Sequence, residues 1–297
     1  MEWQTEPSPA VATPSLSNDL SCLASWRFNR FFKLQFLCAL GAALLLSACA
    51  TPPHRVSEPF HALATDHRIR YEAGAENAAN QVATLLPAAI QQVEAAHGRV
   101  FLGEVVVHVC GTSDCFKRHV RTPNASAATV PDNRVFLAPQ LFGREVHRLP
   151  AILTHELSHL HLGQQIGHYT STVPAWFHEG LAAFAANGGG ADYASDEQAI
   201  ASLRQGKAFE PDQRDTPIKR HTADYWGMDV FVFYRQALLF VNFLRQESAT
   251  RFQDFLQAVQ DNQDFDLAFG NAYNTPLKEA GERFRQFHSV QSLALNP

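Results

Sequence analysis

The 297-residue sequence has no excess of basic residues, no apolar run long enough to cross a bilayer comfortably, and no internal repeat. Its formal net charge of −5 lacks the basic footprint of a nucleic-acid-binding protein, so no nucleic-acid partner is expected. Charged residues are few, at 18%, whereas hydrophobic residues reach 46%, a balance typical of globular proteins and not of disordered ones. At this length the chain holds one large domain or two small ones.

The apolar run near the N-terminus spans only residues 34–46 and follows three basic residues between positions 27 and 33. A basic segment before a short apolar segment is typical of a signal peptide, with an uncleaved signal anchor as the alternative. The run ends in Leu46-Ser47-Ala48-Cys49, which resembles a bacterial lipobox. The resemblance implies cleavage before Cys49 and a lipid on its sulfur, which holds the protein on a membrane.

The residue after the lipobox cysteine is Ala50, which in lipoproteins of two-membrane bacteria favours the outer membrane. We therefore expect a lipid-anchored protein of the cell envelope, on the periplasmic face of the outer membrane. Residues 1–48 are interpreted as an N-terminal extension and signal peptide. Residues 49–70 contain Pro and His without a period and are interpreted as a lipidated tether, and residues 71–297 as the folded domain.

Cysteine is scarce, with five residues in the chain, and two of these belong to the predicted precursor segment. With Cys49 assigned to lipid, only Cys110 and Cys115 remain, separated by Gly-Thr-Ser-Asp. In an exported protein this spacing predicts a small disulfide-closed turn after a strand, with free thiols as the alternative.

The most informative stretch is Thr154-His-Glu-Leu-Ser-His-Leu160, which contains an H-E-x-x-H pattern without a helix breaker. Positions four apart share one face of a helix, so His155 and His159 can bind one metal ion. Glu156 is rotated by about 100° from the first ligand, which suits a base that acts on a metal-held water. On the opposite side the apolar residues recur at helical spacing and predict a buried back: Leu153, Leu157 and Leu160.

A second segment, Pro174-Ala-Trp-Phe-His-Glu-Gly-Leu-Ala-Ala-Phe184, supplies a carboxylate on a following helix. A catalytic zinc site needs three protein ligands and a water, and Glu179 is the candidate for the third. The two segments together resemble the gluzincin metallopeptidases, in which HExxH precedes a glutamate ligand in a W-x-x-E-G-hydrophobic-A sequence. The resemblance implies a zinc metallopeptidase with one catalytic Zn²⁺, a hydrolase that cleaves a peptide or protein substrate.

The metzincin metallopeptidases are excluded, because that family needs Gly and His where this chain has Leu162 and Gln165. Three further imidazoles lie near the ligand segments, at His161, His168 and His178. We expect them to be solvent-facing or supporting histidines that project away from the ligand set.

The expected fold class is α+β, a zincin-like domain with a small mixed N-terminal sheet, a central HExxH helix and a helical C-terminal half. Helical periodicity covers 75–96, interrupted by Pro87, so a kink or two shorter helices are expected there. Other predicted helices are 195–205, 234–247, 251–259 and 276–287, and the predicted strands are 104–109 and 133–138. Residues 234–287 carry a looser similarity to the region that follows the metal site in peptidase-MA-like domains.

The residues that carry the chemistry also suggest how substrate binds. A strand before the HExxH helix can pair with an extended peptide, and the predicted substrate-edge strand consists of Val135, Phe136, Leu137 and Ala138, with an ordinary internal strand as the alternative.

The oxyanion that forms on the substrate would need a second stabilising group besides zinc, such as a hydrogen-bond donor. Tyr234 is the predicted one, and Tyr225 and His221 are the alternatives.

Two other functions compete with peptide hydrolysis. The first is a zinc-binding envelope lipoprotein that acts as an assembly or binding factor without proteolysis, although an intact Glu156 disfavours it because a structural site needs no such base. The second is a metal-free structural lipoprotein whose histidines are paired by chance.

Overall fold

The computed structural model describes residues 60–122, 125–130, 132–167, 172–216 and 219–290. These residues belong to one compact unit, Glu58–Pro297. The predicted signal peptide, the lipobox with Cys49 and the first half of the predicted tether lie outside the described residues. Within the described ranges no helix is both long and apolar enough to span a membrane.

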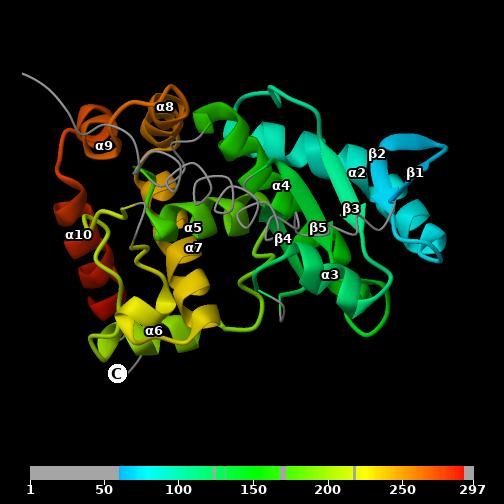
Figure 1. Cartoon of the computed structure of the whole chain (residues 1–297). Helices are drawn as coiled ribbons and strands as arrows, with labels where there is room; N and C mark the ends of the chain where they lie inside the picture. Colours follow the sequence, from blue (N-terminus) through cyan, green and yellow to red (C-terminus); the bar gives the residue numbers. More distant parts are fainter. Residues whose placement is uncertain (1–59, 123–124, 131, 168–171, 217–218, 291–297) are drawn as a thin grey trace, which may run out of the picture. The chain divides into compact units, whose positions relative to one another are not determined.

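A five-stranded mixed sheet forms the N-terminal part of this unit (Figure 1). The strands are β1 (His61–Leu63), β2 (Asp66–Tyr71), β3 (Val106–Val109), β4 (Ala127–Val130) and β5 (Arg134–Leu137), in the spatial order β1-β2-β3-β5-β4. The three central strands β2, β3 and β5 are parallel, and the edge strands β1 and β4 are antiparallel to their neighbours. The prediction of a tether as far as residue 70 is therefore wrong, because residues 61–71 belong to the sheet.

The remainder is mostly helical, so the α+β prediction is confirmed at this level. The helices are α2 (Glu76–His97), α3 (Ser113–His119), α4 (Leu149–Ile166), α5 (Ala175–Ala185), α6 (Asp196–Arg204), α7 (Val230–Glu247), α8 (Ala249–Gln260), α9 (Phe265–Tyr273) and α10 (Leu277–Val290). Short 3-10 turns occur at η1 (Pro139–Phe142), η2 (Val146–Arg148) and η4 (Ala223–Trp226).

Local sequence signals explain where several helices begin and end. The helix α2 runs through Pro87 as a single element, not as two, and ends at Gly98 in the left-handed conformation (φ 70°). The helix α7 begins four residues before the predicted start, because the Asp229 carboxylate accepts hydrogen bonds from the backbone N–H groups of Phe231 and Val232.

Two hydrophobic cores meet at α4. The first lies between the sheet, α2 and the N-terminal two-thirds of α4, and includes Leu153, Leu157 and Leu160. The second lies among α5 and the helices that follow it, and reaches α4 only through its last turns, at Leu162 and Ile166. The apolar back predicted for the HExxH segment is therefore buried in the first core, and the end of α4 also packs against the second core.

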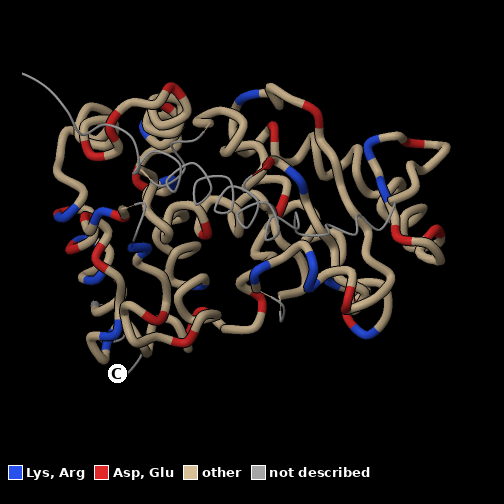
Figure 2. The backbone as a smooth tube through the Cα atoms, viewed as in Figure 1, with Lys and Arg blue, Asp and Glu red and all other residues tan. Residues whose placement is uncertain are grey.

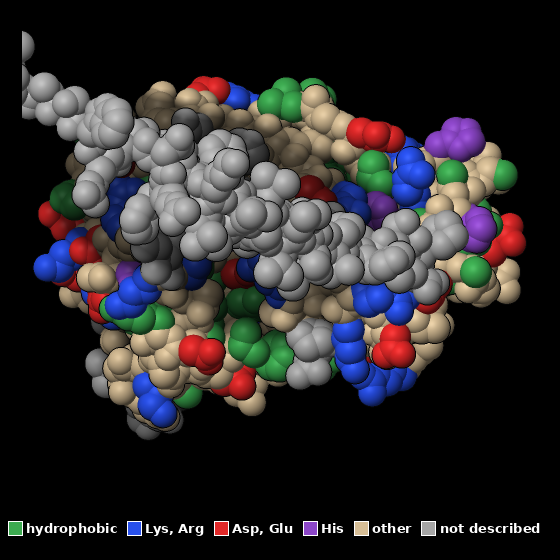
Figure 3. Space-filling view, in the orientation of Figure 1, with side chains coloured by type: hydrophobic (Ala, Val, Ile, Leu, Met, Phe, Trp, Pro, Cys, Tyr) green, Lys and Arg blue, Asp and Glu red, His purple; other side chains and the backbone are tan. Residues whose placement is uncertain are grey.

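The second face of the sheet is covered by α3, which the sequence did not predict. Cys110 at the end of β3 and Cys115 in α3 form the predicted disulfide, with 5.6 Å between their Cα atoms. Basic and acidic residues are interspersed along the described chain (Figure 2). On the face shown in Figure 3, charged side chains of both signs likewise alternate with isolated hydrophobic ones.

Candidate metal centre and cleft

The HExxH segment lies on α4 with both histidines on one face. His155 is buried, with 4% of its surface exposed, whereas the His159 side chain keeps 19%. Their Nε2 atoms lie 3.1 Å apart. The opposite face of the same helix is fully buried in the first core, so the two imidazoles have little freedom to separate.

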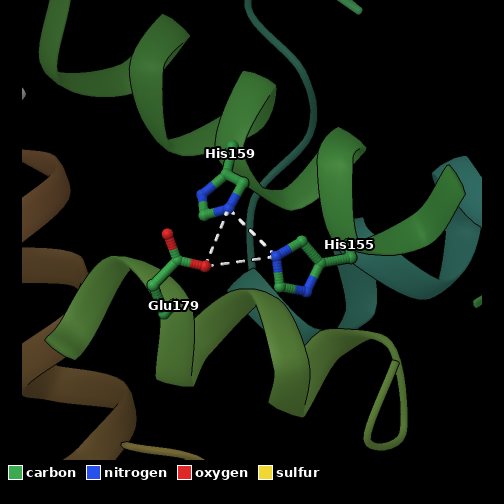
Figure 4. A group of neighbouring side chains, drawn as sticks. All are labelled: His155, His159 and Glu179. Carbon is green, nitrogen blue, oxygen red and sulfur yellow. Dashed lines mark hydrogen bonds and ion pairs between the residues drawn. The ribbon is translucent and has the colours of Figure 1, made fainter. Parts of the chain in front are cut away.

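Glu179 comes from α5, which packs against α4, and its carboxylate points at the two histidines (Figure 4). Its Oε2 atom lies 3.3 Å from His155 Nε2 and 3.5 Å from His159 Nε2. Close packing of α5 on α7 fixes this approach, because a Cβ on Gly180 would lie only 2.6 Å from the Ala237 carbonyl oxygen. The structure brings together the three residues that the sequence predicts as ligands.

The donor set and its spacing fit a zinc ion. A tetrahedral ion at about 2.0–2.1 Å from each ligand atom needs ligand atoms about 3.3 Å apart, and the observed separations are 3.1, 3.3 and 3.5 Å. His155 Nδ1 lies 2.9 Å from the Gly189 carbonyl oxygen, so that nitrogen donates and Nε2 keeps its lone pair. A ligand set of two imidazoles and one carboxylate is one that catalytic zinc uses.

His159 and Glu179 each shift the pKa of the other. Burial lowers the pKa of His159, but the adjacent Glu179 carboxylate more than offsets this, so the pKa lies above its ordinary value. Burial raises the pKa of Glu179, but the interactions with the adjacent His159 and His155 side chains outweigh it and hold the pKa below its ordinary value. Three acceptor atoms therefore converge on one point that favours a cation, either a proton or a metal ion.

Glu156 lies beside this point and lines the same cleft. The Thr129 hydroxyl lies 2.9 Å from Glu156 Oε2 and 2.8 Å from the Glu156 backbone oxygen, and donates to this pair of acceptors. Sequence analysis predicts neither Thr129 nor β4, because the short Ala-Ala-Thr-Val pattern is a weak strand signal.

Tyr234 is the only one of the three predicted oxyanion donors that lines the cleft among the described residues. The charge of Glu179, together with burial, raises the pKa of its hydroxyl, so that the hydroxyl remains a donor. His221 and Tyr225 stack on each other instead, with ring centroids 4.1 Å apart. His221 also lies against the buried carboxylate of Asp215.

The cleft has a volume of about 700 Å³, a size typical of a small-ligand or peptide site. One wall is formed by residues 125–129, and β4 is an edge strand of the sheet. The prediction that residues 135–138 form the substrate edge is wrong, because β5 pairs with β3 on one side and β4 on the other. The three side chains of this set that belong to β5, Val135, Phe136 and Leu137, are fully buried, and Ala138 is 1% exposed.

The supporting histidines differ in their positions. His161 lies in the interior, where its Nε2 is 2.8 Å from the Arg99 carbonyl oxygen, away from the ligand set as predicted. His178 lies closer than expected, with its ring centroid 6.2 Å from that of His159. His168 is outside the described residues.

No protein-family model matches this chain, and no curated protein matches it at a level that indicates a relative. The site residues and the cleft around them are therefore the observations from which a function can be proposed.

Proposed function

We propose that this protein is a zinc-dependent peptidase of the gluzincin type, with a zincin-like fold and with His155, His159 and Glu179 as the metal ligands. The observation that carries the proposal is the convergence of two Nε2 atoms and one carboxylate oxygen at 3.1–3.5 Å, with a second carboxylate, Glu156, in the same cleft. A purely structural zinc site is usually closed by four protein ligands, whereas three ligands facing a cleft leave a position for a substrate or water.

The residues divide the chemistry among them. A zinc ion held by the three ligands supplies Lewis-acid polarisation of a peptide carbonyl and acidifies a water molecule. Glu156, oriented by Thr129, accepts a proton from the attacking water and delivers it to the leaving amine nitrogen. Tyr234, held protonated, donates a hydrogen bond to the oxyanion that develops on the substrate.

The cleft suits an extended polypeptide segment. The outer edge of β4 offers backbone groups for strand addition, and it lies in the wall that also carries Thr129. Across the cleft, Tyr193 and Val230 expose 53% and 41% of their surfaces beside Phe231. These apolar side chains form a shelf on which an apolar side chain of the substrate can pack.

The test compares wild type with Glu156→Gln against a library of quenched fluorescent peptides, with zinc content measured on the same samples. The proposal predicts that both proteins bind one zinc per chain and that turnover in the variant falls at least about 10²-fold, the usual contribution of a general base. Zinc without cleavage by wild type would favour the alternative of a zinc-binding envelope factor.

We also propose that the chain acts in the bacterial cell envelope, anchored through a lipid on Cys49. The lipobox-like sequence before that residue supports this location. We expect mass spectrometry of the N-terminal peptide to show acyl chains on Cys49 in wild type and none in Cys49→Ser.

A further inference from the structure

A buried arginine lies at the end of the cleft, one residue before the metal helix begins. Arg148 is 7% exposed and makes a two-point ion pair with Asp192, with Nε–Oδ2 and Nη2–Oδ1 distances of 2.6 and 3.0 Å. Its Nη1 atom also donates to Glu145 Oε2 at 2.8 Å, and its guanidinium stacks on the Tyr193 ring at 4.1 Å. A buried charge is tolerated only when it is paired and hydrogen-bonded, so this cluster is firmly held.

The Asp192 carboxylate does more than neutralise the arginine. It lies two residues after Gly190, so its pair with Arg148 ties the loop of residues 188–192 to the start of α4. In this loop the carbonyl oxygen of the peptide group between Gly189 and Gly190 lies 2.9 Å from His155 Nδ1. The loop is therefore held at two points, by Arg148 at Asp192 and by a predicted metal ligand at the Gly189 C=O.

The loop that carries this peptide has no space for side chains. A Cβ on Gly190 would lie 2.4 Å from His155 Nδ1, and the residue has a left-handed φ of 86°. A Cβ on Gly189 would lie 2.7 Å from the Ala151 Cβ on α4. The glycine run after α5 thus lets the backbone approach the imidazole directly.

We propose that Arg148 and Asp192 are positioning residues for His155, which act by anchoring the loop that carries the Gly189 carbonyl. By fixing that loop they keep the proton of His155 on Nδ1 and the lone pair of Nε2 directed at the ligand set. The expected effect of these residues on zinc binding rests on the proposed function. Loss of a group that supports a ligand in this way weakens metal binding by about 10–100-fold.

The cluster around Arg148 also contacts the wall of the cleft. The Ser126 hydroxyl donates to Glu145 Oε2 at 2.7 Å, next to the contact that Arg148 makes with the same oxygen. Ser126 precedes the edge strand β4 by one residue. The orientation of His155 and the position of the substrate-facing edge are therefore set by one group of side chains.

The experiment uses the full chain, labelled with ¹⁵N in its histidines, as wild type and as Asp192→Ala and Asp192→Asn. Ring nitrogen spectra of the metal-free protein report the tautomer of His155, assigned by the loss of its signals in His155→Gln. Competition with a chelator reports the zinc dissociation constant. Glu247→Ala is the matched control, since Glu247 makes the same kind of two-point pair with Arg283, at 2.9 and 3.0 Å, on α7 and α10.

We expect the Nδ1-protonated tautomer alone in wild type and a mixture in Asp192→Ala, with a zinc dissociation constant about 10–100-fold higher. Asp192→Asn keeps an oxygen that accepts from Arg148 but loses the charge, so both measurements are expected to lie between those of wild type and Asp192→Ala. Arg148→Lys, which keeps the charge but not the two-point pair, is expected to resemble Asp192→Asn and serves if the alanine variant fails to fold. Glu247→Ala is expected to match wild type in both measurements.

The inference is overturned if the Asp192 and Arg148 variants keep the wild-type tautomer and bind zinc as tightly as the control. The cluster would then be only a cross-link between loops. If wild type binds no zinc, the proposed function fails, but the tautomer comparison in the metal-free protein still decides the positioning role.

Discussion

His155 and His159 point their Nε2 atoms at each other across 3.1 Å, with a carboxylate oxygen of Glu179 equally close. Neutral imidazoles cannot bond at this distance unless one of them carries a proton on the facing nitrogen. The Gly189 carbonyl places the His155 proton on the other nitrogen, Nδ1. The proposed zinc ion, bound between the three atoms, would account for their convergence, and it matches both their identities and their spacing.

Tyr234 gives a direct test of how the oxyanion is stabilised. In Tyr234→Phe the ring remains and only the hydroxyl is lost, so zinc binding should stay at one per chain. The turnover number should fall about 10²-fold, the usual effect of removing one oxyanion donor. Steady-state kinetics on a cleaved peptide, with zinc content measured in parallel, make the comparison. Unchanged turnover with intact zinc would remove Tyr234 from the mechanism.

The packing of α5 on α7 determines where Glu179 lies. At Gly180 an added Cβ would meet the backbone of α7, with the Ala237 oxygen at 2.6 Å and its carbonyl carbon at 2.8 Å. Neither atom belongs to a flexible side chain, so the helices must separate. We expect Gly180→Ala to lower the free energy of unfolding by about 1–3 kcal/mol, the usual cost of overpacking, and to weaken zinc binding because Glu179 moves.

A second helical glycine provides the control. Gly270 in α9 has no atom within 4 Å of an added Cβ. Gly270→Ala should therefore raise the free energy of unfolding by about 0.5–1 kcal/mol through helix propensity alone. Denaturant titrations of the two variants make the comparison, and equal effects would contradict the close approach of α5 and α7.

Elements with a strong period were predictable from the sequence, and those defined by their partners were not. The α4 and α7 helices have apolar residues at helical spacing and a long uninterrupted run, β3 is rich in valine, and β5 is mostly hydrophobic. The strand β2, Asp-His-Arg-Ile-Arg-Tyr, places a single buried residue, Ile69, between charged ones, and its pairing with β1 and β3 makes it a strand.

The site divides in the same way. His155, His159 and Glu156 follow from spacing on one helix, a local property that the sequence contains, and Glu179 follows from the resemblance of its segment to the gluzincins. Thr129 and Asp192 come from an edge strand and a loop, so their roles depend on tertiary contacts that no local pattern encodes. The substrate edge was misplaced for a related reason, since hydrophobic strands such as β5 occupy the interior of a sheet and the accessible edge is the small-residue strand β4.

The folded unit contains two hydrophobic cores that both pack against α4. Groups far from the cleft therefore contribute to its free energy of unfolding. On the outer face of the sheet, His108 stacks on Phe136 at 4.6 Å and is 5% exposed. Burial, together with the nearby groups Arg134, Arg70 and His119, lowers the pKa of His108 to about 4. This histidine is therefore neutral in the folded protein at pH values where the unfolded chain binds a proton.

The consequence is a loss of stability in weak acid. The unfolded imidazole has a pKa near 6.5, so as pH falls below that value the unfolded state gains a proton that the folded state takes up only near pH 4. Between pH 7.5 and 5 this one group should lower the free energy of unfolding by about 2 kcal/mol. His108→Phe keeps the ring stack and cannot titrate, so its decrease should be smaller by that amount in denaturant titrations. Equal decreases in both proteins would contradict the burial of a neutral His108.

The most direct measurement of the central claim is the metal content of the purified protein, by elemental analysis, in wild type and Glu179→Ala. Glu247→Ala is the control, because it removes a carboxylate of similar exposure (29% against 21%) away from the cleft. The proposed site predicts one zinc per chain in wild type and in the control, and a site lost or greatly weakened in Glu179→Ala. Equal zinc in all three proteins, or no zinc in any of them, would contradict it.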